Sequence, residues 1–178
     1  MVVIDFSQVK ALRLSKIYNL SKFDCGDKDI NEFLRHDALI YQEQKLATTT
    51  IFTFHDELIG FFSTAADSIK LKLEEKEGHH IQNKPIHEFP AIKISRLGRD
   101  IKYKDQKVGV AILKWAIGYI LKCSEMTAVR FVTIDAYPHK VNWYGQFGFV
   151  RNLDDRYTKK DHHVSMRYNL LNELQKPE

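Results

Sequence analysis

The sequence predicts an α/β fold with a mixed central sheet flanked by helices, and three observations lead to this prediction. Residues 129–136 form a β-branched and aromatic run that is typical of a buried strand. Residues 91–97 also read as a strand, and residues 108–123 between the two form a strongly apolar helical segment. Because a strand, a helix and a strand in this order make a parallel crossover, we expect the two strands to pair in parallel.

The N-terminal part of the chain predicts a helix and an antiparallel hairpin. A short strand and a turn are expected within residues 10–22. Apolar residues recur at helical spacing within residues 27–45, and the side chains of residues 24–27 suit the capping of the first turn. The β-branched and aromatic residues of segments 46–54 and 58–64 lie on either side of a polar interruption, which predicts the hairpin.

The remaining segments predict one exposed connection, a short helix and a last strand. Residues 69–89 are polar and contain Pro85 and two adjacent histidines, so we expect an exposed excursion across the sheet edge. Residues 141–147 predict a short helix that ends at Gly148. Residues 164–170 alternate between apolar and polar side chains and predict the last strand.

The composition predicts one compact domain over residues 1–178. Hydrophobic residues make up 44% of the chain and charged residues 28%, which is ordinary for a globular protein. Lys and Arg number 27 and Asp and Glu 23, so a net charge of +4 permits an anionic partner without requiring one. No apolar stretch reaches the roughly 18 residues of a membrane span, so no membrane partner is expected.

The cysteines and the N-terminus predict a cytoplasmic location. Cys25 and Cys123 lack the density and spacing of a secreted disulfide framework, so we expect free thiols in a reducing compartment. The first six residues lack the basic start and the apolar run of a secretory signal.

The segment Asp105-Gln106-Lys107-Val108-Gly109-Val110-Ala111 has the features of an anion-binding loop. It leads into the predicted helix, whose first turn presents free backbone N–H groups and whose dipole attracts anions. Gly109 lets the backbone approach a ligand closely and Ala111 leaves the same face open, so the segment can wrap a pyrophosphate. The alternative is an ordinary connection whose small residues only permit tight packing.

The order of these elements and two motifs resemble the GNAT superfamily of N-acetyltransferases, which have an acyl-CoA N-acyltransferase fold. The family has Gln or Arg, two residues, Gly, one residue, and then Gly or Ala, and Gln106, Gly109 and Ala111 match this pattern. The run Asn142-Trp143-Tyr144-Gly145-Gln146-Phe147-Gly148-Phe149 is similar to the closing motif of the family. The resemblance implies an N-acetyltransferase with acetyl-CoA as its cosubstrate.

Two further segments are similar to the GNAT toxins of bacterial toxin–antitoxin pairs. These segments are Phe23-Asp24-Cys25-Gly26 and Ser95-Arg96-Leu97-Gly98-Arg99-Asp100, and the resemblance covers residues 22–168. It implies acetylation of the amino group of aminoacyl-tRNA, a small antitoxin protein as a partner, and a homodimer. The chain departs from the family at Gly98-Arg99, where Ala-Val is usual, and at Tyr137-Pro138-His139-Lys140, where small residues are common.

The resemblance also implies roles for individual residues. Tyr144 is the expected catalytic acid, because a phenol with an ordinary pKa near 10 can protonate a departing thiolate at modest cost. Alternatively, Tyr144 only packs against Trp143 and Phe147. The expected cofactor-binding residues are Leu97, Gly98, Arg99, Gln106, Lys107, Val108, Gly109, Val110, Ala111 and Asn142. Backbone N–H groups at residues 97–99 are expected to bind the pantetheine arm and to polarise the acetyl carbonyl.

The other polar residues leave several interpretations open. His87 and Glu88 are candidate bases that act through water, or ordinary solvated residues. His79-His80 and His162-His163 lack the partners of a known metal site, so no metal is expected. The basic residues expected near phosphates, or simply on a solvated surface, are Lys70, Lys72, Lys93, Arg96, Arg99, Lys102, Lys104, Lys107, Lys159 and Lys160.

Two other functions stay open from the sequence. One is a GNAT enzyme that acetylates a small amine or a protein amino group. The other is a non-catalytic acetyl-CoA-binding module. Expression of an active enzyme without toxicity would favour the first of these functions over a toxin. Binding of acetyl-CoA without acetyl transfer would favour the second.

Overall fold

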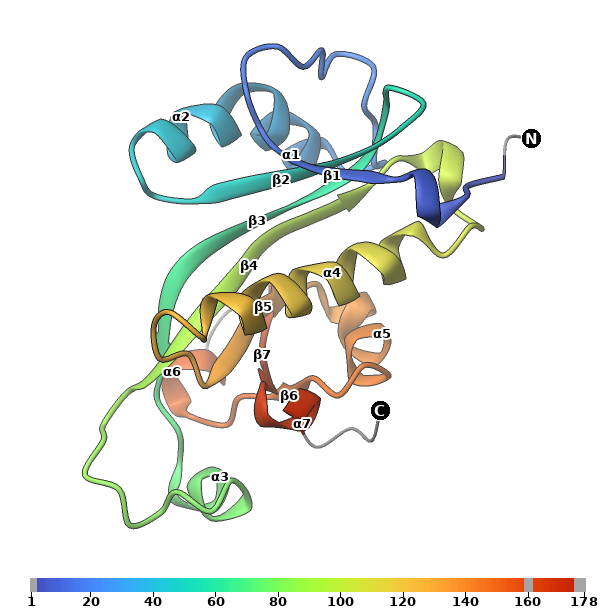
Figure 1. Cartoon of the computed structure of the whole chain (residues 1–178). Helices are drawn as coiled ribbons and strands as arrows, with labels where there is room; N and C mark the ends of the chain where they lie inside the picture. Colours follow the sequence, from blue (N-terminus) through green and yellow to red (C-terminus); the bar gives the residue numbers. More distant parts are fainter. Residues whose placement is uncertain (1–2, 159–161, 175–178) are drawn as a thin grey trace. The chain divides into compact units, whose positions relative to one another are not determined.

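The computed structural model describes residues 3–158 and 162–174 (Figure 1). The chain divides into two compact units. The first unit comprises Met1–Ala65 and Ile94–Gly118, and the second comprises Ala66–Lys93 and Tyr119–Glu178. The prediction of a single domain over residues 1–178 stays a prediction.

The sheet of the first unit contains β1 (Lys10–Arg13), β2 (Thr48–Phe54), β3 (Glu57–Ile69) and β4 (Phe89–Arg99), hydrogen-bonded in that order. β1 and β2 are antiparallel, and so are β2 and β3. Both residues between β2 and β3 have positive φ angles, 49° and 62°, which suits a two-residue hairpin turn. The predicted hairpin is confirmed, and its second strand continues past the predicted end at residue 64.

The predicted helix of residues 27–45 is confirmed with a local change of geometry. It consists of α1 (Lys28–Glu32), a π-helical turn η2 (Phe33–Asp37) and α2 (Ala38–Glu43). Asp27 caps it as predicted, because its Oδ1 accepts from the N–H of Ile30 at 3.0 Å. The ring of Phe33 stacks on Phe61 of β3, which joins this helical segment to one face of the sheet.

Helix α4 (Val108–Cys123) has the predicted bounds, and its first-unit part covers the other face of β3. A Cβ added at Gly60 would lie only 2.3 Å from Cδ1 of Ile112, so the helix approaches the strand closely there. Trp115 contacts the ring of Phe52 edge to face at 5.9 Å between ring centres. The end of β4 and the start of α4 therefore belong to one packed unit.

The strands of the second unit are hydrogen-bonded in the order β3-β4-β5-β7-β6. β5 (Phe131–Ala136) pairs in parallel with β4, with Ala91 opposite Phe131, which confirms the predicted crossover. β7 (Val164–Asn169) and the two-residue β6 (Val150–Arg151) add antiparallel pairs at the edge.

The predicted exposed excursion over residues 69–89 is wrong in part. This segment contains helix α3 (Leu73–Gly78), and apolar residues at both ends of the segment are buried against Phe131. Glu75 of α3 is also buried and forms an ion pair with Arg167 of β7, with 2.5 Å between Oε1 and Nη1. The charge of Glu75 can be buried here because it is paired with Arg167, which lies far away in the sequence.

The C-terminal part of the second unit contains three short helices. These are α5 (Val141–Gly145), α6 (Asp155–Thr158) and α7 (Leu171–Leu174). α5 follows a 3-10 turn, η4 (Pro138–Lys140), and Gly148 has a φ of 89°, which agrees with the predicted stop.

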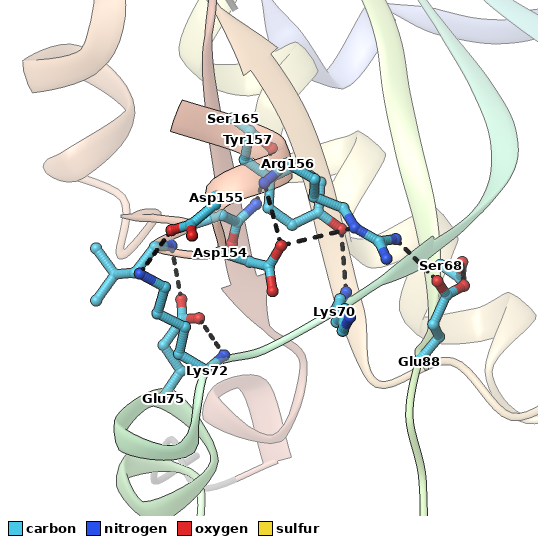
Figure 2. Close-up of polar contacts among 12 residues, drawn as sticks. Ser68, Lys70, Lys72, Glu75, Glu88, Asp154, Asp155, Arg156, Tyr157 and Ser165 are labelled. Atoms are coloured by element: carbon cyan, nitrogen blue, oxygen red, sulfur yellow. Dashed lines mark hydrogen bonds and ion pairs between the residues drawn. The ribbon is translucent and has the colours of Figure 1, made fainter. Parts of the chain in front are cut away.

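Helix α6 lies against the segments that flank α3 through polar contacts (Figure 2). Arg156 Nη1 donates to Glu88 Oε1 at 2.8 Å, and Lys72 pairs with Asp155 at 2.9 Å. The backbone N–H of Lys70 donates to the hydroxyl of Tyr157 at 3.0 Å. In the part of the chain that the structure describes, no helix is long and apolar enough to cross a membrane.

Candidate active site

The end of β4 and the start of α4 lie close together in the first unit. A Cβ added at Gly109 would lie 4.0 Å from the Cβ of Arg99, which is an ordinary contact, so an alanine would fit at this position. Because packing does not require a glycine here, the geometry favours close approach of a ligand over the tight-packing alternative.

The first turn of α4 leaves three backbone donors without acceptors inside the helix. The first helical hydrogen bond runs from the N–H of Ala111 to the carbonyl of Lys107 at 3.0 Å. The N–H groups of Val108, Gly109 and Val110 precede this bond in the helix. Together with the dipole of a 16-residue helix, they form a site that attracts an anion.

The side chain of Gln106 has a contact that the sequence did not predict. Its Oε1 accepts a hydrogen bond from the backbone N–H of Ile4 at 2.7 Å. The loop is therefore hydrogen-bonded to the N-terminal segment of the same unit. The side-chain oxygen of Gln106 accepts this bond from the protein backbone.

The two toxin-like segments are hydrogen-bonded to each other. The N–H of Ile101 donates to the carbonyl of Asp24 at 2.8 Å, and the N–H of Asp24 donates to the buried carboxylate of Asp100 at 3.3 Å. Asp24 also accepts from the N–H of Gly26 and from the side chain of Asn31. The Phe23–Gly26 segment thus fixes the backbone just after β4.

Packing explains the departure from the family at Gly98. A Cβ at this position would lie 2.8 Å from the ring of Phe61 and 3.3 Å from the ring of Phe23. An alanine would collide with the ring of Phe61 and crowd that of Phe23, so the packing at this strand end favours a glycine.

The basic residues divide into paired and solvent-facing groups. Lys93 lies 3.1 Å from a carboxylate oxygen of Asp135 and 3.8 Å from one of Asp67, and Lys72 is paired with Asp155. These pairs favour a structural role for both lysines. The exposed members of the predicted set are Lys70, Arg96, Lys102, Lys104 and Lys107. Arg99 is half-buried and donates to the carbonyl of Asp100 at 3.0 Å. Lys159 and Lys160 lie outside the described residues.

Tyr144 and Asn142 belong to α5 of the second unit. The ring of Tyr144 lies edge to face against Trp143 at 4.8 Å and against Phe149 at 5.6 Å between ring centres. Burial raises the pKa of Tyr144 to about 12. Asn142 lines an open, largely apolar groove of about 660 Å³ together with Phe149 and Met166.

Nine of the eleven predicted site residues belong to the first unit. They are Leu97, Gly98, Arg99, Gln106, Lys107, Val108, Gly109, Val110 and Ala111. Asn142 and Tyr144 are together in the second unit.

The candidate base Glu88 accepts two hydrogen bonds that lower its basicity. Ser68 Oγ donates to one carboxylate oxygen at 2.6 Å and Arg156 to the other at 2.8 Å (Figure 2). The bond from Ser68, followed by that from Arg156, lowers the pKa of Glu88. A lower pKa makes a carboxylate a poorer proton acceptor, so this geometry argues against Glu88 as the base.

The side chain of His79 is hydrogen-bonded to another side chain of the protein. Its Nε2 accepts from Nε of Arg167 at 3.1 Å, and burial, followed by the charge of Arg167, lowers its pKa to about 4. Within residues 3–158 and 162–174, no group of three or more His, Cys, Asp or Glu side chains could hold a metal ion. Cys25 and Cys123 are free thiols, as predicted.

Comparison with known proteins gives similar sequences and similar structures. No protein-family model matches the chain. A tRNA-acetylating toxin of Mycobacterium tuberculosis (strain ATCC 25618 / H37Rv) is 24% identical over 124 residues, which are 70% of this chain and 73% of the toxin.

Two solved structures of the toxin AtaT are similar over nearly the whole chain. AtaT complexed with acetyl-methionyl-tRNAfMet has a TM-score of 0.79 at 16% identity and covers 93% of this chain and 97% of its own. An AtaT mutant bound to the C-terminus of the antitoxin AtaR and to acetyl-CoA has a TM-score of 0.74 at 15% identity, with 95% and 99% covered. This chain therefore shares the fold of AtaT, and its similarity to bacterial toxins, one of them a tRNA-acetylating toxin, agrees with the resemblance inferred from its sequence.

Proposed function

We propose that this chain is an acetyl-CoA-dependent N-acetyltransferase that acetylates the amino group of aminoacyl-tRNA and thereby blocks translation. The observation that supports this function most directly is the open approach at Gly109, where the free N–H groups of α4 lie beside the end of β4. The similarity to a tRNA-acetylating toxin and to AtaT with acetyl-methionyl-tRNAfMet supports the same activity and acceptor.

The first unit supplies the groups that hold the cosubstrate. The N–H groups of Val108, Gly109 and Val110 donate to the pyrophosphate, where the helix dipole also favours negative charge. Lys104 and Lys107 lie at the loop and add solvent-facing positive charge. The backbone of residues 97–99 binds the pantetheine arm and polarises the acetyl carbonyl, which makes it a better electrophile.

Tyr144 acts on the thiolate that leaves. With its pKa near 12, Tyr144 keeps its proton at neutral pH. A phenol with a raised pKa gives up its proton to a thiolate with a pKa near 8.5 less readily than an ordinary phenol does. Tyr144 therefore stabilises the developing charge on sulfur by a hydrogen bond, and water completes the protonation.

The acceptor amine needs little help from a protein base. An α-amino group has a pKa near 8, so a substantial fraction is unprotonated and nucleophilic near neutral pH. This agrees with the lowered pKa of Glu88, which is unsuited to accept the proton.

The partners and the location belong to the same proposal. We expect a small antitoxin protein to neutralise the toxin, and the AtaT structure with AtaR supports this expectation. A homodimer and a cytoplasmic location, where charged tRNA is found, complete the proposal.

Inducible expression in bacteria tests the proposed function in cells. We expect translation to stop on induction of the wild type and to continue on induction of Tyr144→Phe. The second candidate function is acetylation of a small amine or a protein amino group, which the mild net charge of +4 permits. Continued translation with an active wild-type enzyme would select that candidate, and an absence of any transfer would indicate a binding module.

A further inference from the structure

A tight turn directly after α5 packs against the ring of Tyr144. The backbone carbonyl of Tyr144 accepts from the N–H of Phe147 at 3.0 Å and from the N–H of Phe149 at 3.3 Å. Gly148, between these two donors, has a φ of 89°, a left-handed conformation that reverses the chain. The reversal brings the buried ring of Phe149 against the ring of Tyr144, with 5.6 Å between the ring centres and 65° between the planes.

Tyr168 of β7 contacts this turn at two points. Its ring lies 5.4 Å from the ring of Phe149, measured between centres, at an angle of 41°. A Cβ added at Gly148 would lie only 3.1 Å from Cε2 of Tyr168, so the backbone of the turn also packs closely on the ring. The turn that holds Tyr144 is therefore in contact with Tyr168 through both its backbone and a side chain.

The ring of Tyr168 is itself fixed at both ends. Tyr168 is 3% exposed, and its backbone is paired with Val132 of β5 in the antiparallel ladder of β5 and β7. Its hydroxyl donates a hydrogen bond to a carboxylate oxygen of Glu173 in α7, as a buried tyrosine requires. The sheet and α7 thus hold this ring in one position.

Helix α5 needs such a support because it is short. It has only five residues, and a helix of this length is not stable by itself in water. Trp143, the other ring beside Tyr144, belongs to the same helix, so its contact with Tyr144 does not join the helix to the sheet. The contacts of Phe149 and Gly148 with Tyr168 do make this connection.

We propose that Tyr168 is a positioning residue of the acetyl transfer, which acts through Phe149 and Gly148 to hold the hydroxyl of Tyr144 in place. This inference rests on the proposed function, in which Tyr144 donates a hydrogen bond to the departing sulfur. Misplacing a reacting group by about 1 Å can cost roughly 100-fold in rate, so the support of Tyr144 affects the chemical step. The hydroxyl of Tyr168 is bonded to Glu173, and the residue acts through the position of its ring alone.

Steady-state acetylation of charged tRNA tests the proposal. Tyr168→Leu removes the supporting ring and should lower kcat roughly tenfold, with KM for acetyl-CoA unchanged. Tyr168→Phe keeps the ring and should restore kcat. The matched control is Phe89→Leu, which removes another buried ring of the same unit, one that packs on Phe131. Equal kcat values for Tyr168→Leu and Phe89→Leu would overturn the proposal.

A double-mutant cycle separates positioning from a general loss of structure. If Tyr168 acts through Tyr144, Tyr168→Leu should lower kcat no further in a protein that already carries Tyr144→Phe. A residue that only maintains the fold would lower kcat by the same factor in both backgrounds. That second result would reject Tyr168 as a positioning residue.

A nuclear magnetic resonance measurement tests the same contact without any acetyl transfer. The nuclear Overhauser signal between the rings of Tyr144 and Phe149 reports their distance directly, and Tyr144→Phe identifies the tyrosine resonance. This signal should be lost or strongly weakened in Tyr168→Leu and kept in Tyr168→Phe and Phe89→Leu. If the wild type fails to acetylate charged tRNA, the proposed function fails, and this signal still decides whether Tyr168 holds Tyr144. An unchanged signal in Tyr168→Leu would reject the proposal.

Discussion

Gly109 at the start of α4 faces Arg99 at the end of β4, and a Cβ at Gly109 would be 4.0 Å from the Cβ of Arg99. This spacing leaves room for a methyl group. The free N–H groups of the same helical turn make the position the centre of the anion site. Substitutions at Gly109 can therefore test its role in anion binding while the fold is kept.

We predict that Gly109→Asp abolishes acetyl-CoA binding, because a carboxylate at this point repels the pyrophosphate and occupies its approach. Such like-charge contact costs several kcal/mol, so the Kd should rise by more than about 100-fold in calorimetric titration. Gly118→Asp is the control, since Gly118 is exposed on the same helix and a Cβ there meets nothing within 4 Å. An unchanged Kd for Gly109→Asp would reject the loop assignment.

The ion pair between Glu75 and Arg167 should be essential to the second unit. Their side chains are 1% and 7% exposed, so removing one partner leaves a buried charge uncompensated. We predict that Glu75→Gln lowers the free energy of unfolding by about 3–5 kcal/mol in urea. The control is Glu43→Gln, which breaks an exposed pair with Lys16 and should cost under about 1 kcal/mol. Similar losses for the two variants would contradict this account of burial.

Alkaline pH should destabilise the protein between about pH 10 and pH 12. Burial raises the pKa of both Tyr103 and Tyr144 to about 12, whereas an unfolded tyrosine titrates near 10. In this window the unfolded chain has lost these protons and the folded chain keeps them, so stability is present below pH 10 and is lost as the pH rises. Ultraviolet titration of wild type against Tyr144→Phe should show one fewer late-titrating phenol. A complete transition near pH 10 in the folded protein would refute the burial argument.

Acid pH should also destabilise the second unit through His79. Its pKa is lowered to about 4, while an unfolded histidine titrates near 6.5. The unfolded chain binds this proton first, so the stability contributed by a neutral His79 is lost as the pH falls from 6.5 toward 4. We predict a shallower pH dependence of the urea midpoint for His79→Asn than for wild type. Parallel curves over this range would show that His79 is not the group responsible.

The sequence predicts the elements whose patterns are local and long. Helix α4 has the predicted bounds because its apolar residues continue over four turns, and β5 and β7 follow from β-branched and alternating residues. The burial of Glu75 in helix α3 escapes prediction because its charged partner Arg167 lies 92 positions later. The two-residue β6 is too short to leave a pattern.

The same distinction applies to the candidate site. The helix start at Gly109 is visible in the sequence, since free N–H groups follow from any helix terminus. The raised pKa of Tyr144 is not visible, because it depends on burial that the packing of Phe149 helps to create. The contact between the rings of Tyr137 and His163 is also hidden, since it depends on the pairing of β5 with β7.

One measurement tests the central claim most directly. Purified wild type and Tyr144→Phe are incubated with labelled acetyl-CoA and a pool of charged tRNA, and the released aminoacyl groups are analysed by mass. The account predicts label on the amino group of the aminoacyl moiety with wild type and a strong loss of label with Tyr144→Phe. Label absent from the tRNA but present on polyamines or peptides added to the same reaction would contradict it.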